Sequence, residues 1–225
     1  MRIGMVVAVE IDAVLERYGE PQRMEKHGEF TVRVYNVHGS ELIIAHSGVG
    51  EISAAACTQL LISVYGAEMI LNFGVVGGLT EEMSKTTACV VEKVVHYDFD
   101  CEAIDGTAVG QYAGFPDVYI PTDERLRAAA LRIAPELKQV ICASGDKFVA
   151  DREKKEALHE RFGADICEME SAGIALTSFR NKVPCLLIKT VSDGISGGAE
   201  EYLSEVRKTS AVCLSVADMI LEEGL

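Results

Sequence analysis

The feature that most constrains this chain is a set of short apolar segments in which polar residues do not alternate. Residues 3–9, 69–73, 139–143 and 183–191 are apolar along most of their length. Strands of this kind belong in a sheet that is covered on both faces, because a sheet with one wet face gives an alternating pattern. Stretches with apolar residues at helical spacing separate these segments. The pattern therefore predicts an α/β fold with helices on both faces of a sheet.

The order of the expected elements refines this fold class. Residues 30–37 and 41–45 flank His38-Gly39-Ser40 and are expected to form an antiparallel hairpin. Elsewhere strands alternate with helices, which is typical of parallel pairing. We expect one three-layer αβα domain over residues 1–225, with a central mixed, largely parallel sheet. Further strands are expected at 87–96 and 166–167, and helices at 11–18, 51–65, 123–133, 151–162, 169–179 and 200–222.

Composition excludes several classes of partner. The net charge of -14 argues against nucleic acid and against an anionic membrane surface, since both require a basic surface. Apolar runs stay shorter than the ~18 residues of a membrane span, and the first residues do not have the pattern of a signal peptide. The seven cysteines contain no C-x-x-C pair, which favours free thiols in a reducing compartment. We therefore expect a cytoplasmic protein with a small-molecule ligand.

Polar and glycine-rich segments follow the expected strands. In open α/β sheets, ligands bind in the crevice at the carboxyl ends of the strands. Each segment also has a simpler explanation: Asp12 suits the first turn of a helix, and the glycines at 74–78 suit a tight turn. Taken together they predict a polar crevice. Its members are Glu10, Asp12, residues 47–50, residues 74–78, residues 144–148, Glu168, Glu170, Ser192 and Asp193.

Two other groups of residues are not expected to take part in chemistry. His96 and Asp98 share one face of a strand, but the chain offers no second histidine at a comparable strand end. Zinc and iron sites prefer more imidazole or thiolate ligands, so we expect no metal ion and no other cofactor. Lys154 and Lys155 are expected to be surface charges of a helix.

The strand-end segments together resemble the nucleoside phosphorylase/nucleosidase superfamily, and more narrowly the bacterial 5′-methylthioadenosine/S-adenosylhomocysteine nucleosidases. Ser144-Gly-Asp-Lys-Phe-Val149, Glu168-Met-Glu-Ser-Ala172 and Val191-Ser-Asp193, in this order and spacing, are the specific part of the likeness. It extends to residues 1–10, 47–50, 72–79 and 110–111. The resemblance implies hydrolysis of the N-glycosidic bond of a purine nucleoside, without a cofactor, by a homodimer.

The resemblance also implies roles for single residues. Asp193 matches the general acid that protonates the departing purine, and Asp12 the carboxylate that activates the attacking water. Glu170 matches the ligand of the ribose hydroxyls. The other substrate-binding residues implied by the matching segments are Gly77, Phe148, Val149, Glu168, Met169, Ser192 and Ile104.

The chemistry fits this assignment of the acid. An N-ribosyl bond breaks through an oxocarbenium-like transition state, as in glycosidases, so the leaving base needs a proton. Asp193 must then hold a proton near neutral pH, and a desolvated crevice with several other acids would favour that form.

Departures from the family pattern gather where the attacking water would bind. Asp12 replaces a glutamate, Val75 a serine and Lys189 an arginine, so Glu10 is a candidate to help at the water site. Ile104 stands where an aromatic residue is usual in the loop that lines the neighbouring subunit's 5′-substituent pocket. These departures leave open a purine nucleoside phosphorylase, a futalosine hydrolase and a non-catalytic nucleoside sensor. Phosphate as the nucleophile would require arginines or a helix N-terminus with free amides. The glycine-rich segments contain no arginine and Val75 removes a hydroxyl donor, so water is preferred, while Lys189 leaves phosphate open.

Overall fold

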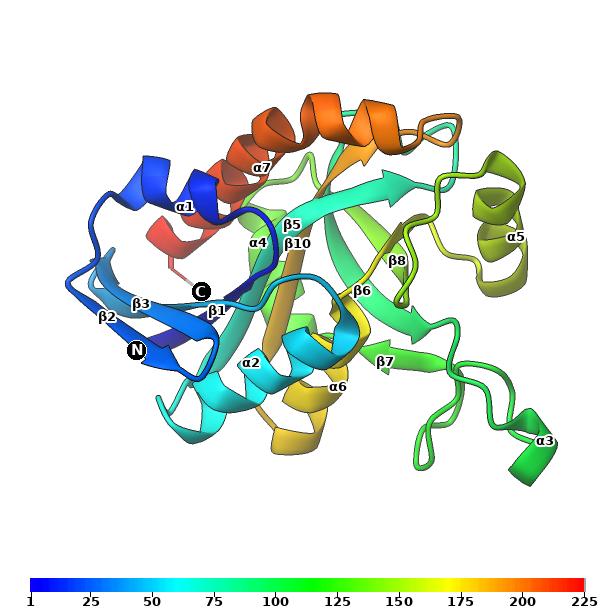
Figure 1. Ribbon diagram of the computed structural model, residues 1–225, viewed down its shortest axis with the longest axis horizontal. Coiled ribbons are helices and arrows are strands. Elements are labelled where there is room, and N and C mark those ends of the chain that lie inside the picture. The colour runs from blue at the N-terminus through cyan, green and yellow to red at the C-terminus, as the bar shows by residue number, and fades with distance from the viewer. Residues whose placement is uncertain (225) are drawn as a thin grey trace.

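The structure is a computed structural model that describes residues 1–224, and within them ten strands form one mixed sheet (Figure 1). The strand order is β10-β6-β8-β9-β5-β1-β4-β3-β2, with β7 paired to β6. β10 also pairs with β5, so β5, β10, β6, β8 and β9 close into a ring. The strands are β1 (Arg2–Val7), β2 (Arg23–His27), β3 (Phe30–Val37), β4 (Ser40–His46), β5 (Met69–Gly78), β6 (Ala88–His96), β7 (Tyr119–Pro121), β8 (Lys138–Ser144), β9 (Ile166–Glu168) and β10 (Cys185–Asp193).

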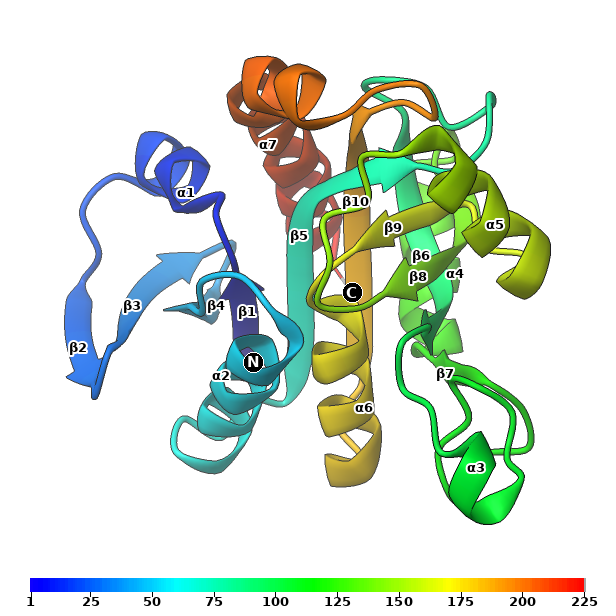
Figure 2. The same cartoon turned by 45° about the vertical axis from the view of Figure 1, so that its right-hand side comes forward.

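Helices cover both faces of this sheet, which confirms the predicted layers (Figures 1 and 2). One core lies between the sheet and α2 and α6, and the other between the sheet and α1, α4 and α7. Residues along β10 alternate between the two cores: Leu187 and Val191 face the first, and Leu186 and Ile188 the second. The helices are α1 (Ile11–Tyr18), α2 (Glu51–Ser63), α3 (Glu102–Asp105), α4 (Glu124–Ile133), α5 (Arg152–Phe162), α6 (Ser171–Asn181) and α7 (Ala199–Glu222).

Residues 74–78 differ from their prediction, because they continue strand β5 instead of forming a turn. Their glycines do not have positive φ angles. They provide space instead: a Cβ built on Gly78 would lie 2.1 Å from the carbonyl oxygen of Met83, and one on Gly74 2.9 Å from Glu10 Oε1. Glycine is needed here because Met83 and Glu10 pack directly against the backbone of β5. The sequence alone does not distinguish this need for space from a need for turn geometry.

Three short elements were not anticipated. β2 is charged and lies at the edge of the sheet, where hydrophobic alternation is weak, while α3 and β7 have only four and three residues. Antiparallel pairing is also more common than expected, because five of the ten pairings among residues 1–224 are antiparallel. Asp123 caps the N-terminus of α4, with its side chain accepting from Leu126 N.

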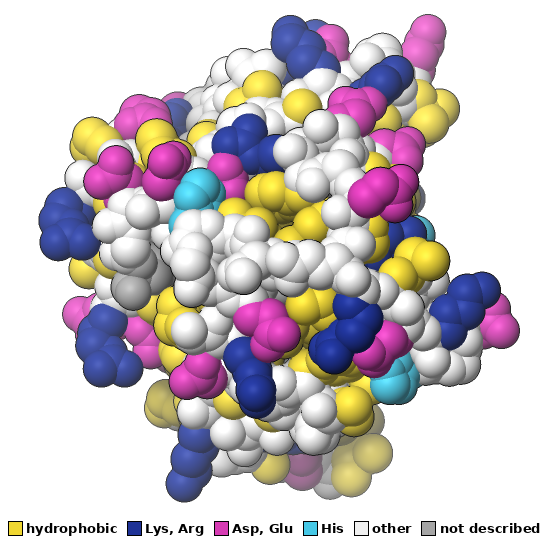
Figure 3. Space-filling model, turned by 90° about the vertical axis from the view of Figure 1, so that its left-hand side faces the viewer, with side chains coloured by type: hydrophobic (Ala, Val, Ile, Leu, Met, Phe, Trp, Pro, Cys, Tyr) yellow, Lys and Arg dark blue, Asp and Glu magenta, His cyan; other side chains and the backbone are white. Residues whose placement is uncertain are grey.

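The surface carries charges of both signs despite the acidic composition. On the face shown in Figure 3, acidic and basic side chains are interspersed, and hydrophobic side chains are visible in a hollow between them. Within residues 1–224, the helices are all too short or too polar to cross a membrane.

The contact between α2 and α6 gives a test of the fold. A Cβ on Gly173 would lie 2.4 Å from the carbonyl oxygen of Glu51, so Gly173→Ala must push the two helices apart. Helix propensity alone would make this substitution stabilising by about 1 kcal/mol. We expect overpacking to outweigh that gain and to lower the free energy of unfolding by about 1–3 kcal/mol in urea titrations. A rise in stability would contradict the close helix contact.

Candidate active site

A cavity of about 280 Å³ lies where β5, β9 and β10 end. The pairing of the ring explains its position, because Gly77 of β5 is in register with both Cys167 of β9 and Asp193 of β10. The volume is close to the lower end of the range for small-molecule sites. The structure brings together here ten residues that the sequence singled out: Glu10, Val75, Gly77, Phe148, Val149, Glu168, Met169, Glu170, Ser192 and Asp193.

Asp193 is the last residue of β10 and is only 2% exposed. Its Oδ1 accepts from Ser192 Oγ at 2.9 Å, and its Oδ2 accepts from Lys155 Nζ at 2.7 Å. A Cβ on Gly77 would lie 3.2 Å from Oδ2, so the glycine leaves room for this carboxylate. The acid therefore faces an ammonium group, in contrast to the expected crowd of other acids.

Lys155 is completely buried, so the prediction that it is a surface charge is wrong. The sequence contained a signal for this position. Lys155, Leu158 and Phe162 are three and four residues apart and therefore lie on one face of α5, and Phe162 is buried. A lysine on the apolar side of an otherwise charged helix indicates a buried partner.

Glu10 is the carboxylate at the other side of the cavity. It is buried, and its Oε1 accepts from Val75 N and its Oε2 from Val9 N, each at 3.0 Å. Gly74 leaves the space that Glu10 occupies. At position 75 a backbone amide thus contacts the carboxylate, where the family pattern has a serine hydroxyl.

Asp12, predicted for the water site, is not among the residues that line the cavity. It is an exposed residue in the first turn of α1, near Arg207 of α7. Successive helical residues are rotated by about 100°, so a residue two positions after Glu10 points to nearly the opposite side. The simpler explanation of Asp12, an acid that suits a helix N-terminus, fits this position.

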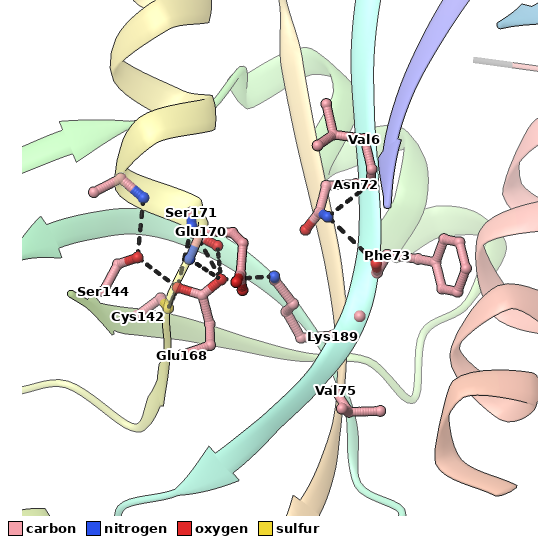
Figure 4. Close-up of polar contacts among 12 residues, drawn as sticks. Val6, Asn72, Phe73, Val75, Cys142, Ser144, Glu168, Glu170, Ser171 and Lys189 are labelled. Carbon is pink, nitrogen blue, oxygen red and sulfur yellow. Dashed lines mark hydrogen bonds and ion pairs between the residues drawn. The ribbon is translucent and has the colours of Figure 1, made fainter. Parts of the chain in front are cut away.

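Lys189 also lies outside the lining of the cavity. Its buried Nζ binds Glu168 Oε2 at 3.0 Å (Figure 4). Glu168 further accepts from Ser144 Oγ at 2.6 Å and from Ser171 Oγ at 2.8 Å. Burial alone would raise the pKa of Glu168, but Lys189 and these hydrogen bonds hold it below its ordinary value. Glu168 thus has its partners inside the protein, at the edge of the cavity.

Glu51 extends this buried network and was not singled out from the sequence. Burial, followed by the charge of Glu168, raises its pKa from 4.5 to about 8. The hydrogen-bond count agrees: Ser144 Oγ contacts both Glu51 and Glu168 but has one proton. Ala172 N also donates to Ser144 Oγ, so the hydroxyl oxygen acts as an acceptor there. If Ser144 gives its one proton to Glu168, the proton in the contact with Glu51 comes from the Glu51 carboxyl group.

Glu170 lines the cavity from the start of α6. Its Oε1 accepts from Gly50 N at 2.9 Å, which links it to the N-terminus of α2. Burial, followed by the charge of Glu168, raises its pKa to about 7.

The remaining wall of the cavity is largely apolar. Phe148 is 47% exposed and packs edge-on against Tyr202 of α7, with ring centroids 5.4 Å apart. Tyr202 lies one turn into the last helix and had no sequence signal. Val49, Val76 and Lys147 also line the cavity, within segments that the sequence places at the crevice. The other lining residues that the sequence did not single out are Ala8, Val9 and Cys167.

Ile104 does not line the cavity of its own chain. It is 87% exposed on α3, which projects from the body of the molecule (Figure 2).

His96, considered above as a metal ligand, contacts Asp98 at 3.1 Å and Tyr112 at 2.7 Å. Within residues 1–224, no group of three or more His, Cys, Asp or Glu side chains has an arrangement that could hold a metal ion.

Comparison with known proteins gives consistent matches along the chain. A model of the phosphorylase superfamily matches residues 2–224. The aminodeoxyfutalosine nucleosidase of Campylobacter jejuni is 33% identical over 224 residues, covering 94% of this chain and 95% of that protein. The 5′-methylthioadenosine/S-adenosylhomocysteine nucleosidase of Shewanella pealeana is 30% identical over 225 residues, covering 94% and 96%.

Solved structures agree with these matches. The futalosine hydrolase of Helicobacter pylori superposes with a TM-score of 0.93 at 28% identity, covering 99% of this chain and 98% of that one. The 5′-methylthioadenosine/S-adenosylhomocysteine nucleosidase of Campylobacter jejuni superposes with a TM-score of 0.90 at 30% identity, covering 99% of each chain.

The raised pKa of Glu51 predicts a pH dependence of stability. The unfolded chain loses this proton near pH 4.5, whereas the folded protein keeps it to about pH 8, so stability falls as pH rises between these values. The slope for one such group approaches ~1.4 kcal/mol per pH unit. We expect Glu51→Gln to flatten the fall in urea-unfolding free energy between pH 5 and 8. Glu29→Gln, at an exposed turn, is the control, and an unchanged slope in Glu51→Gln would contradict the protonated Glu51.

Proposed function

The chain belongs to the phosphorylase superfamily, and from this we propose that it hydrolyses the N-glycosidic bond of a purine nucleoside, releasing the base and a 5-substituted ribose. The observation that carries the proposal is a cavity with Asp193 at one strand end and Glu10 at another. Cleavage of an N-ribosyl bond needs an acid for the base and a carboxylate for the attacking water.

Asp193 is the proposed general acid. It lies buried at the end of β10 with both oxygens fixed by hydrogen bonds, so its orientation toward a base in the cavity is set before the substrate binds. Phe148 offers an aromatic face at the cavity wall for the base, and Glu170 a carboxylate for the ribose hydroxyls.

Glu10 is the proposed base for water, in place of Asp12. Backbone amides hold both of its oxygens, and Gly74 gives it room beside β5. The loss of the family's glutamate at position 12 is thus offset by a glutamate two residues earlier.

Water is favoured over phosphate as the nucleophile. In the described part of the chain no arginine lines the cavity, Lys155 is paired with Asp193, and Lys189 is paired with Glu168. Lys147 does line the cavity, but it is exposed and lies 3.5 Å from Asp98. A phosphate dianion would lack the arginines that usually bind it.

The substrate class that we propose is an adenine nucleoside with a 5′ extension. The similar proteins are nucleosidases for aminodeoxyfutalosine and for 5′-methylthioadenosine and S-adenosylhomocysteine, and both groups match over nearly the whole chain. Activity on 5′-methylthioadenosine would place the enzyme in methionine salvage. The buried free thiols fit a cytoplasmic location.

We further propose that two copies form a homodimer in which Ile104 reaches the neighbouring cavity. The support is the exposed position of Ile104 on the projecting α3 and the exposed Ile52 on α2. Sedimentation of a monomer at micromolar concentration would contradict the dimer.

Substitution of the acid tests the proposed reaction. Asp193→Asn keeps the shape but removes the transferable proton, so we expect kcat to fall by about 10²- to 10⁴-fold with little change in KM. The assay measures free base from methylthioadenosine, S-adenosylhomocysteine, adenosine, inosine, futalosine and aminodeoxyfutalosine, each with and without phosphate. Phosphate-dependent release would indicate a phosphorylase, and absence of release from every substrate a non-catalytic sensor.

A matched pair of substitutions tests the water site. We expect Glu10→Gln to lower kcat by about 10²-fold or more and Asp12→Asn to leave it within about twofold, because only Glu10 lies at the cavity. The reverse result would return the base to Asp12.

A further inference from the structure

Lys155 is the most completely buried charge that the proposed reaction does not use. Its side chain comes from α5 and is fully excluded from solvent. Its Nζ lies 2.7 Å from Asp193 Oδ2, 2.8 Å from the carbonyl oxygen of Gly194 and 3.1 Å from that of Gly197. The lysine therefore joins the proposed acid to the residues that connect β10 to α7.

The number of acceptors indicates the state of this amine. An ammonium group has three protons and a neutral amine has two, and here three oxygens lie within hydrogen-bond distance. Loss of one proton would leave a buried carbonyl without this donor, at the cost of an unsatisfied polar group. Lys155 is thus a fixed charge and not a proton relay.

We propose that Lys155 is a positioning residue and fixed counter-ion for Asp193, which holds the carboxyl group at the leaving base and stabilises the carboxylate left after proton transfer. The proposal rests on the assignment of Asp193 as the acid. In that step the proton moves from Asp193 to the base as the C–N bond breaks, its electron pair goes to the base, and the negative charge stays on Asp193 beside the ammonium. An opposite charge fixed before the reaction stabilises that product without rearrangement.

The effect of the Lys155 ammonium group on the reaction can be measured by substitution. Because the ammonium lies 2.7 Å from Asp193 Oδ2, charge at position 155 acts on the step in which Asp193 gives up its proton. The readout is the alkaline limb of the activity profile, which should move when the Lys155 charge is removed and stay in place when only packing changes. The other titratable groups that face this pair are Cys167 from β9 and Glu201 and Tyr202 from α7.

Substitutions on α5 separate charge from packing. Lys155→Met removes the charge and keeps most of the volume, Lys155→Gln removes the charge and keeps a donor, and Lys155→Arg keeps the charge. Arg152→Met is the matched control, since Arg152 binds Ser196 Oγ at 2.8 Å in the same connection but does not contact Asp193. The measurement is kcat against pH from 5 to 10 on the best substrate, with circular dichroism to confirm folding.

We expect the alkaline limb of the profile to move in Lys155→Met and Lys155→Gln, with kcat on the low-pH plateau lowered at least tenfold. Lys155→Arg and Arg152→Met should keep the limb of the unsubstituted enzyme. A lower kcat with an unmoved limb in a folded charge-removing variant would overturn the counter-ion role. If Lys155→Met does not fold, Lys155→Gln and Lys155→Arg still give the comparison.

If Asp193 is not the general acid, the experiments give a different result from the one expected if only the role of Lys155 is wrong. Turnover retained in Asp193→Asn would contradict the assignment of the acid itself, whatever the Lys155 variants do. An alkaline limb that disappears in Asp193→Asn but stays in place in Lys155→Gln would contradict the role of Lys155 alone.

Discussion

The structure depends on the pairing of buried charge at the strand ends. A charge without a partner in the interior is strongly destabilising, and here two buried lysines each bind one buried carboxylate, Lys155 with Asp193 and Lys189 with Glu168. Backbone amides hold Glu10 instead. The carboxylates of one cavity therefore differ in their partners: Asp193 contacts Lys155, Glu168 contacts Lys189, and Glu10 accepts from two backbone amides.

The closed ring of strands is what allows these groups to meet. Because β5 pairs with both β9 and β10 near its end, Gly77 lies beside Cys167 and Asp193 at once. Glycine at position 77 leaves the space in which Lys155 reaches Asp193 Oδ2. At position 74 it leaves the space for Glu10. The glycine-rich end of β5 therefore serves the site through its lack of side chains.

Most of the fold could be predicted from local patterns. Apolar runs and helical spacing identified the long strands and helices, since burial on both faces leaves a clear signal in residue order. The edge strand β2 was missed because its residues are polar. The residues after the strands were a sound guide to the cavity, because the ends of neighbouring strands meet at one edge of the sheet. The sequence did not show that Asp12 lies outside the cavity lining, because the rotation between Glu10 and the first turn of α1 depends on where the helix begins.

The sequence by itself determined the layered α/β fold, the family and the set of strand-end residues from which the cavity is built. Only the tertiary structure decided which residues meet: that Lys155 of α5 contacts Asp193 of β10, that Ser144 joins Glu51 to Glu168, and that Glu10 lines the cavity whereas Asp12 does not. The reason is physical. Burial patterns are periodic along the chain and can be recognised locally, whereas a buried ion pair joins residues that are distant in sequence, and its partners are defined only once the strands and helices have packed.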